Sequence, residues 1–297
     1  MIMNDLKTCM AMLTFCTFST FSFAFQNSSS LKADSTSTKQ INYTEDTFFS
    51  TRVVNGQSTE GIPQGRLDFR IEHRFDLIKN GYPEFFGLDH AYTFFGLEYG
   101  IKDWLMVGIN RTSLSQAVSG YTKISLLRQS TGHMITPLSV SLLLGSSYMG
   151  TSIDNSINSA DFSSRLSYTS QILIARKFND HFSAQVSPVW IHRNKVISLT
   201  NANNVFALGL SANYKIAPTL SLSGEYYPVI NPSVYYQNHN SNSLSFSFNI
   251  QTEGHVFQIV LSNSTDMIEK NFIGETTGNW LKGDIHLGFN ILRKFEL

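Results

Sequence analysis

Histidine, serine and acidic side chains are the groups in this sequence that could perform catalysis or bind a metal. The eight histidines occur in no His-Glu-x-x-His segment or other ligand spacing, and Asp89-His90 and Asp180-His181 are single adjacent pairs. The glycine-rich stretch 145–150 lacks the spacing of a serine nucleophile elbow. No phosphate-binding or dinucleotide-binding glycine pattern occurs. We therefore expect no enzyme, no cofactor and no metal site.

Charged side chains recur at alternate positions of segments that are otherwise apolar at every second residue. In 66–75, for example, Leu67, Phe69 and Ile71 alternate with Asp68 and Arg70. A period of two residues predicts a β-strand whose two faces differ. The charged residues of this kind are Asp68, Arg70, Glu72, Arg74, Glu98, Lys123, Arg165, Glu225 and Asp284.

The elements that must position these charges are about twelve antiparallel strands. Their expected ranges are 66–75, 91–99, 105–109, 121–128, 138–145, 165–178, 182–192, 205–216, 220–229, 243–250, 255–262 and 284–291. The connections after the second, sixth, eighth and tenth strands are tight, whereas most of the others run to about ten residues or more. Short turns on one side and long loops on the other are typical of a transmembrane up-and-down β-barrel. The short turns would then be periplasmic and the long loops extracellular.

Export is expected from the N-terminus. A polar start is followed by an apolar run, 9–24, and then by a polar stretch, which is the pattern of a cleavable signal peptide covering 1–24. Cys9 and Cys16 both lie inside it, so the mature chain would contain no cysteine. Residues 25–46 are rich in Ser, Thr and Asn and are interpreted as a flexible linker. The barrel domain is then 47–297, and its short apolar segment ending at Asn55-Gly56 is either a strand or a segment folded against the barrel mouth.

Composition favours the outer membrane of a Gram-negative bacterium. Charged residues make up 15% of the chain, against about 25% in typical soluble domains, and aromatic residues make up 13%. Aromatic rings flank the tight turns, and Tyr148, Trp190, Phe206 and Tyr227 lie near the long-loop ends, as in the two girdles of a membrane barrel. The formal net charge of zero argues against a nucleic-acid partner. The expected partners are the lipid bilayer, the outer-membrane assembly machinery, since Phe295 closes an alternating last strand, and small solutes.

The charged face must point into the lumen. One Arg or Lys near the middle of the lipid face costs about 2–4 kcal/mol, so placing Arg70 and Arg74 there together with two acids would be prohibitive. By the same alternation His73 falls on the lipid side. The nine charged residues would therefore line the lumen, either as a lining that selects permeants or as a structural network that fills a narrow barrel. Both interpretations remain open.

Several segments resemble a family of bacterial membrane-bound β-barrel domains that has no assigned function. The residues that carry the resemblance lie in 51–58 (TRVVNGQS), 67–75 (LDFRIEHRF), 86–89 (FGLD), 98–101 (EYGI) and 107–111. Asp76 departs from the family pattern, in which glycine usually follows the His-Arg-Phe triplet. The resemblance implies a membrane barrel and supplies no mechanism.

The sequence leaves three functions open. The first is a structural or narrow-lumen barrel that passes small solutes at most, and the second is an open channel or uptake porin. The third is an outer-membrane lipase that uses His73, His192 or His255 as a base, but no His-x-Ser segment lies on a strand with an evident orienting partner. In the first long loop, Phe85, Phe86, Gly87 and Leu88 form an apolar element with three open roles: a constriction of the lumen, a contact for a partner, or packing on its neighbours.

Overall fold

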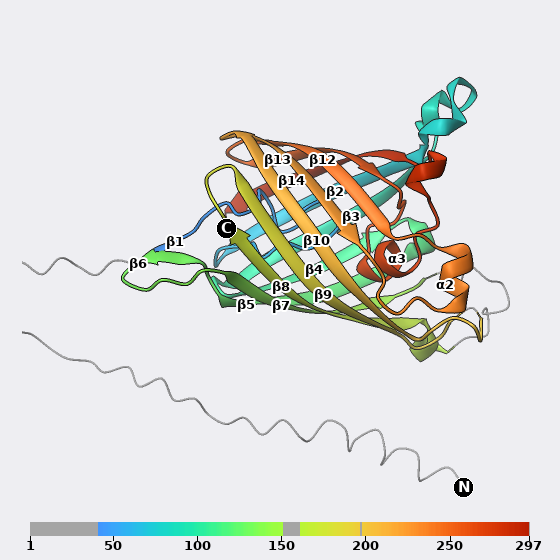
Figure 1. Ribbon diagram of the computed structural model, residues 1–297, viewed down its shortest axis with the longest axis horizontal. Helices are drawn as coiled ribbons and strands as arrows, with labels where there is room; N and C mark the ends of the chain where they lie inside the picture. The colour runs from blue at the N-terminus through green and yellow to red at the C-terminus, as the bar shows by residue number, and fades with distance from the viewer. Residues whose placement is uncertain (1–40, 151–160, 197, 297) are drawn as a thin grey trace, which may run out of the picture. The chain divides into compact units, whose positions relative to one another are not determined.

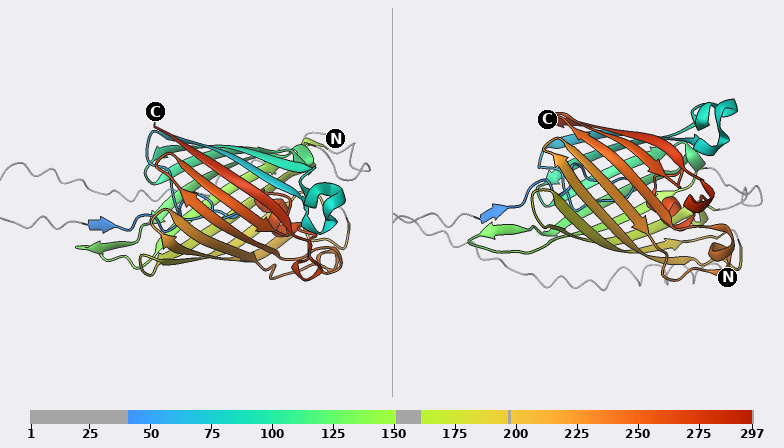
Figure 2. Two further views of the ribbon diagram at one scale, coloured as in Figure 1. Left: turned by 90° about the horizontal axis from the view of Figure 1, so that it is seen from above. Right: turned by 45° about the horizontal axis from the view of Figure 1, so that its top comes forward.

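The computed structural model describes residues 41–150, 161–196 and 198–296, which form a closed β-barrel (Figures 1 and 2). The expected signal peptide, 1–24, lies outside these residues, as does most of the expected linker. The end of that linker forms a strand, β1 (Ile41–Tyr43), which pairs with β6 (Ser130–Gly132) in a separate two-stranded sheet. None of the helices in the three described ranges is long and apolar enough to cross a membrane.

Twelve antiparallel strands make the barrel, which confirms the predicted fold class and strand number. They are β2 (Arg66–Leu77), β3 (Ala91–Lys102), β4 (Leu105–Thr112), β5 (Val118–Leu127), β7 (Ser139–Tyr148), β8 (Leu166–Lys177), β9 (Phe182–Arg193), β10 (Asn204–Ala217), β11 (Leu220–Tyr227), β12 (Ser243–Gln251), β13 (His255–Ser262) and β14 (His286–Glu296). Each strand pairs with its neighbour in the chain, and β14 pairs with β2 to close the barrel, with Ile291 opposite Ile71. Closure leaves no free strand edge in the barrel.

The two ends of the barrel differ as predicted. The connections β3–β4, β8–β9, β10–β11 and β12–β13 are tight turns at one end, here called the short-turn end, where β1, β6 and the C-terminus also lie (Figure 1). The opposite long-loop end carries the helices α2 (Val234–His239) and α3 (Glu269–Gly274) and the 3₁₀ turns η1 (Ile78–Asn80), η2 (Tyr82–Gly87), η3 (Leu114–Gln116), η5 (Phe162–Arg165) and η6 (Trp280–Lys282).

The two faces of each strand follow the alternation of the sequence. In β3, Phe95, Leu97 and Tyr99 are 38–48% exposed and face outward, whereas Glu98 is 2% exposed and faces the lumen. His73 faces outward, as expected, and stacks on Phe289 at 4.6 Å between ring centroids. The apolar surface is therefore on the outside and the polar surface on the inside, which is the inverse of a soluble β-sandwich and suits a lipid solvent.

One expected girdle residue is not at the lipid surface. Tyr227 is fully buried and faces the lumen, and its neighbour Tyr226 is the exposed one. The reason is the two-residue period: Tyr227 lies two positions after Glu225 on β11 and therefore shares its face. The inward ring packs edge-on against Phe272 of α3 at 5.2 Å between ring centroids.

Candidate functional site: a plugged lumen

The lumen is filled by residues 47–62, which we call the plug segment. The chain enters from the short-turn end after β1, turns back at Asn55-Gly56 and leaves at the same end to begin β2. The turn is held by Val53 N donating to Gly56 O at 2.7 Å and by Ser58 N donating to Thr51 O at 2.9 Å. Every residue from 47 to 59 is buried. The plug segment is thus a loop inserted into the barrel, with both of its ends on the same side.

A wall carboxylate binds the tip of this loop. Glu225 of β11 accepts hydrogen bonds from the backbone N–H groups of Asn55 at 2.8 Å, Gly56 at 3.0 Å and Val54 at 3.2 Å. Successive N–H groups that converge on one anion form an anion-binding nest. Here the nest belongs to the plug segment and the anion to the wall. The three hydrogen bonds offset the cost of removing the Glu225 carboxylate from water.

A wall ammonium binds the carbonyl groups of the same loop. Lys123 Nζ of β5 donates to Thr51 O at 3.0 Å, to Ser58 O at 3.0 Å and to Glu60 O at 3.1 Å. An ammonium has three protons, so these contacts use its whole hydrogen-bonding capacity. Lys123 therefore joins the two arms of the plug segment.

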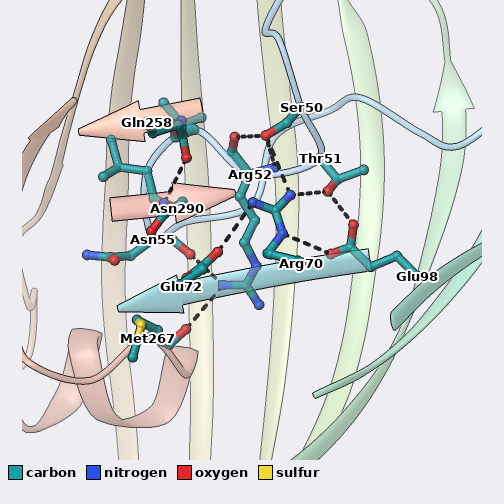
Figure 3. Close-up of polar contacts among 12 residues, drawn as sticks. Ser50, Thr51, Arg52, Asn55, Arg70, Glu72, Glu98, Gln258, Met267 and Asn290 are labelled. Atoms are coloured by element: carbon teal, nitrogen blue, oxygen red, sulfur yellow. Dashed lines mark hydrogen bonds and ion pairs between the residues drawn. The ribbon is translucent and has the colours of Figure 1, made fainter. Parts of the chain in front are cut away.

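A third group of contacts lies between the plug segment and β2 and β3 (Figure 3). Arg70 Nη2 donates to Thr51 Oγ1 at 2.9 Å, and Thr51 Oγ1 donates to Glu98 Oε2 at 2.5 Å. Arg70 also pairs with Glu72 at 3.3 Å and lies 3.8 Å from Glu98. The Thr51 hydroxyl thus links a cation and an anion of the wall.

Further polar groups hold the tip. Arg74 Nη2 donates to Asn55 Oδ1 at 2.6 Å, and Asn55 Nδ2 donates to Ser245 Oγ at 3.0 Å. Gln258 Nε2 donates to Val53 O at 2.8 Å. Glycine is required at position 56, since a Cβ there would lie 1.8 Å from Tyr227 Oη, and Tyr227 is itself held by Phe272.

The long-loop end is closed by the β13–β14 connection, which reaches the plug segment through α3. Arg52 Nη1 donates to Met267 O at 3.1 Å, and Arg52 Nη2 lies 3.4 Å from Glu269, which also accepts from Gln57 Nε2 at 3.1 Å. Burial alone would lower the pKa of Arg52, but Glu269 and the acidic wall raise it above its ordinary value. Arg52 is therefore charged, and it bridges two segments that enter from opposite ends.

The described residues line a polar cavity near each end of the barrel. The one at the short-turn end, about 390 Å³, is lined by residues of the plug segment and by Arg66, Asp68 and Lys294. The one at the long-loop end, about 360 Å³, is lined by the β13–β14 connection and by Asp76, Ser115 and His286. The buried middle of the plug segment lies between the ends of the barrel, where an open pore would have its channel.

The charged residues that the alternation indicated fall into two sets. Seven of them are at most 2% exposed on the lumen face: Asp68, Arg70, Glu72, Arg74, Glu98, Lys123 and Glu225. Arg165 instead belongs to η5 and donates to Gly150 O at 2.7 Å, and Asp284 lies before β14 beside Lys79. Neither lies on a barrel strand, because β8 and β14 begin later than the alternation suggested, at Leu166 and His286; Asp284 lines the cavity at the long-loop end.

The apolar element of the first long loop does not constrict the lumen. Phe85, Phe86 and Gly87 belong to η2, with Leu88 directly after it, and this turn projects away from the barrel mouth (Figure 1). Phe85 is 56% and Phe86 49% exposed. The backbone at both residues has positive φ, 46° and 56°, so the loop makes a tight local turn.

The three histidines considered as bases have other contacts among the described residues. His192 Nδ1 lies 2.9 Å from Asn204 Oδ1, but the residue opposite it on β8 is Tyr168 rather than a serine. His255 contacts Arg293, and His73 stacks on Phe289. The described part of the chain contains no cluster of three metal-ligating side chains. The lipase alternative gains no support from this geometry.

The model of a family described as "Membrane bound beta barrel domain (DUF5777)" matches residues 48–295. The chain belongs to this family. The match to the membrane-bound barrel family begins inside the plug segment, so that segment is part of the family's domain. None of the curated proteins matches the chain.

Solved structures share the fold of this family member. The NanC porin is 12% identical, with 78% of this chain and 100% of that chain covered and a TM-score of 0.50. The KdgM porin is 8% identical, with 78% and 99% covered and a TM-score of 0.44. At such identities the likeness concerns the fold alone. The protein is thus a membrane β-barrel with porin-like neighbours.

Proposed function

We propose that the protein is a non-enzymatic outer-membrane barrel that is closed at rest by its plug segment and passes small polar solutes when that segment leaves the lumen. The observation that carries this proposal is the burial of residues 47–59 inside a barrel whose lumen charges bind them. In this proposal residues 1–24 are the cleaved export signal, the short-turn end is periplasmic, and Phe295 on β14 serves recognition by the assembly machinery.

Removal of the plug segment is compatible with an intact barrel. The strand ladder closes through β14 and β2 without any contribution from residues 47–62. The plug contacts are mostly hydrogen bonds, each worth about 0.5–1.5 kcal/mol net, because water replaces them when the segment leaves. Both ends of the segment lie at the short-turn end, so it can withdraw as a loop without threading.

A permanently closed, structural barrel is the second candidate. The contact that favours it is the one between Arg52 and the β13–β14 connection, because that contact holds the lumen shut from the other end as well. Conductance in planar bilayers distinguishes the two candidates.

The decisive variant is Gly56→Ala, because its Cβ would lie 1.8 Å from Tyr227 Oη. Overpacking of this kind costs about 1–3 kcal/mol, which corresponds to about a 5- to 150-fold change in the docking equilibrium. The matched control is Gly61→Ala in the same segment, where the nearest atom to a Cβ is Asp103 O at 3.8 Å. We expect long closed intervals for the wild type and Gly61→Ala, and frequent steady current steps for Gly56→Ala.

A covalent lock completes the test. Cysteines in place of Asn55 and Ser245, whose side chains are in contact, would tie the tip of the plug segment to β12. This pair is added to Gly56→Ala in a chain whose Cys9 and Cys16 are replaced by Ala. Oxidation should abolish the steps and reduction should restore them. If Gly56→Ala is silent although it migrates as a folded, heat-modifiable barrel, the channel proposal is wrong and the structural barrel stands.

A further inference from the structure

Side chains of the barrel wall bind the plug segment mainly at the segment's own main-chain N–H and C=O groups. Besides the contacts to Glu225 and Lys123, Gln185 Nε2 donates to Gln57 O at 2.7 Å and Gln185 Oε1 accepts from Thr59 N at 2.9 Å. Gln258 Nε2 donates to Val53 O, and Ser141 Oγ donates to Thr59 O. The lumen is therefore a surface complementary to peptide N–H and C=O groups.

The two charged groups that bind main-chain atoms of the plug segment lie on different walls. Glu225 on β11 receives N–H donors, whereas Lys123 on β5 donates to carbonyl oxygens. Around the barrel, four strands separate β11 from β5 on one side and six on the other, so the two groups stand on nearly opposite walls. Once the plug segment is gone, one wall offers a carboxylate and the facing wall an ammonium.

The lumen also has room for an extended chain. The plug segment passes through it twice, and its two arms lie side by side where Arg52 pairs with Gln57. A lumen that accommodates two passes of main chain admits one extended peptide together with water.

We infer that the permeants of the opened lumen are short zwitterionic peptides, for which the plug segment is a built-in substitute. This inference rests on the proposed function. The peptide ammonium group faces Glu225, the carboxylate faces Lys123, and the peptide groups between them use Gln185 and Gln258. A solute with charge of one sign is attracted by one of these two groups and repelled by the other. A neutral sugar has no ionic interaction with either group, and both stay hydrated.

Swelling of proteoliposomes that contain Gly56→Ala tests the inference. The iso-osmotic solutes are triglycine and glucose, which are similar in mass and differ in charge distribution. We expect triglycine to enter about threefold faster, an effect of the size that one solvated ion pair supplies. Both residues also hold the plug segment, so Glu225→Gln or Lys123→Met can raise both rates, and the readout is the ratio of the triglycine rate to the glucose rate. Adding either substitution should lower this ratio from about three to about one. Glu253→Gln in the exposed β12–β13 turn is the matched control and should alter neither rate.

The outcomes separate the two proposals. The peptide inference is overturned, while the gated channel stands, by either of two results. One is entry of both solutes at equal rates through Gly56→Ala, and the other is a triglycine-to-glucose ratio that Glu225→Gln and Lys123→Met leave unchanged. Faster entry of glutarate or of lysine than of triglycine overturns it too, because it shows selection by one charge sign. Entry of no solute through a folded Gly56→Ala barrel overturns the channel and the peptide inference together.

Discussion

Arg52 and Glu269 approach each other to 3.4 Å inside the barrel, although one enters from the short-turn end and the other from the long-loop end. Arg52 is 1% and Glu269 6% exposed. The guanidinium also lies 5.1 Å from the centre of the Phe94 ring. This pair connects the plug segment to α3, so the two closures of the lumen are expected to depend on each other.

Breaking this pair should release the plug segment. In Glu269→Gln, Arg52 loses its ionic partner in a buried setting, which costs about 3–5 kcal/mol. Trypsin can cut after Arg52 only when the segment is undocked, so cleavage there should accelerate strongly. Glu275→Gln is the control, because Glu275 lies on the same connection but pairs with Arg193 and Lys270. Equal cleavage rates in both variants would contradict the coupling.

The loss of Lys123 should loosen the two arms of the plug segment. Lys123→Met removes three donors and leaves the carbonyl oxygens of Thr51, Ser58 and Glu60 without them. An unsatisfied buried polar group costs about 1–3 kcal/mol. We expect faster amide hydrogen exchange at Val53 and Ser58, whose N–H groups bond within the loop. Lys102→Met, at an exposed site, should leave exchange unchanged; if it has the same effect, Lys123 has no special role.

Docking of the plug segment should weaken as pH rises. Burial raises the pKa of Glu60 above its ordinary value of 4.5, although the N–H groups of Thr47 and Phe48 partly offset this effect. A carboxyl whose pKa is raised by docking contributes fully to the docking free energy below about pH 4.5, the pKa of the undocked group. This contribution is lost as pH rises through the pKa of the docked group. The protection of residue 52 from cleavage by a protease active across this range should therefore decline with pH. Glu60→Gln should flatten that dependence, and an unchanged slope would assign it to another group.

A charge on the outer wall should oppose membrane insertion. Ile109 on β4 is 56% exposed and opposite Gly120, in the apolar band. Ile109→Arg should cost about 2–4 kcal/mol of folding free energy in a bilayer near the midplane. Leu281→Arg, in the exposed η6 turn, should cost little. Urea titration in lipid vesicles measures both, and similar midpoints for the two variants would place the apolar band elsewhere.

The sequence pattern is sufficient to predict the strands of the barrel, but not to predict what fills the lumen. Alternation such as that of Leu67 to Phe75 marks each strand and its faces, because the two solvents impose opposite demands on successive residues. It also placed Asp68, Glu98 and Glu225 inside. Arg165 and Asp284 could not be assigned correctly by the same rule, because the pattern does not show where a strand begins.

The apolar segment that ends at Asn55-Gly56 was expected as a strand or folded against the barrel mouth, and its insertion into the lumen was not predicted, for a physical reason. Its contacts join residues far apart in the chain, such as Asn55 with Glu225 and Val54 with Asn290, and no local period reports them. One signal was present: the apolar pair Val53-Val54 followed by Asn55-Gly56, a turn-forming dipeptide. It indicated a turn, but not that this turn would lie inside the barrel.

The pairing of Val54 with Asn290 spans 236 residues and lies beside the seam where β14 joins β2. The first part of the domain to be synthesised therefore finds this partner only after the last strand exists. A contact of such sequence separation closes a loop of nearly the whole domain, which costs chain entropy and slows folding. The segment that closes the lumen thus gains its full set of contacts only in a closed barrel, and its complete docking reports that β14 has joined β2.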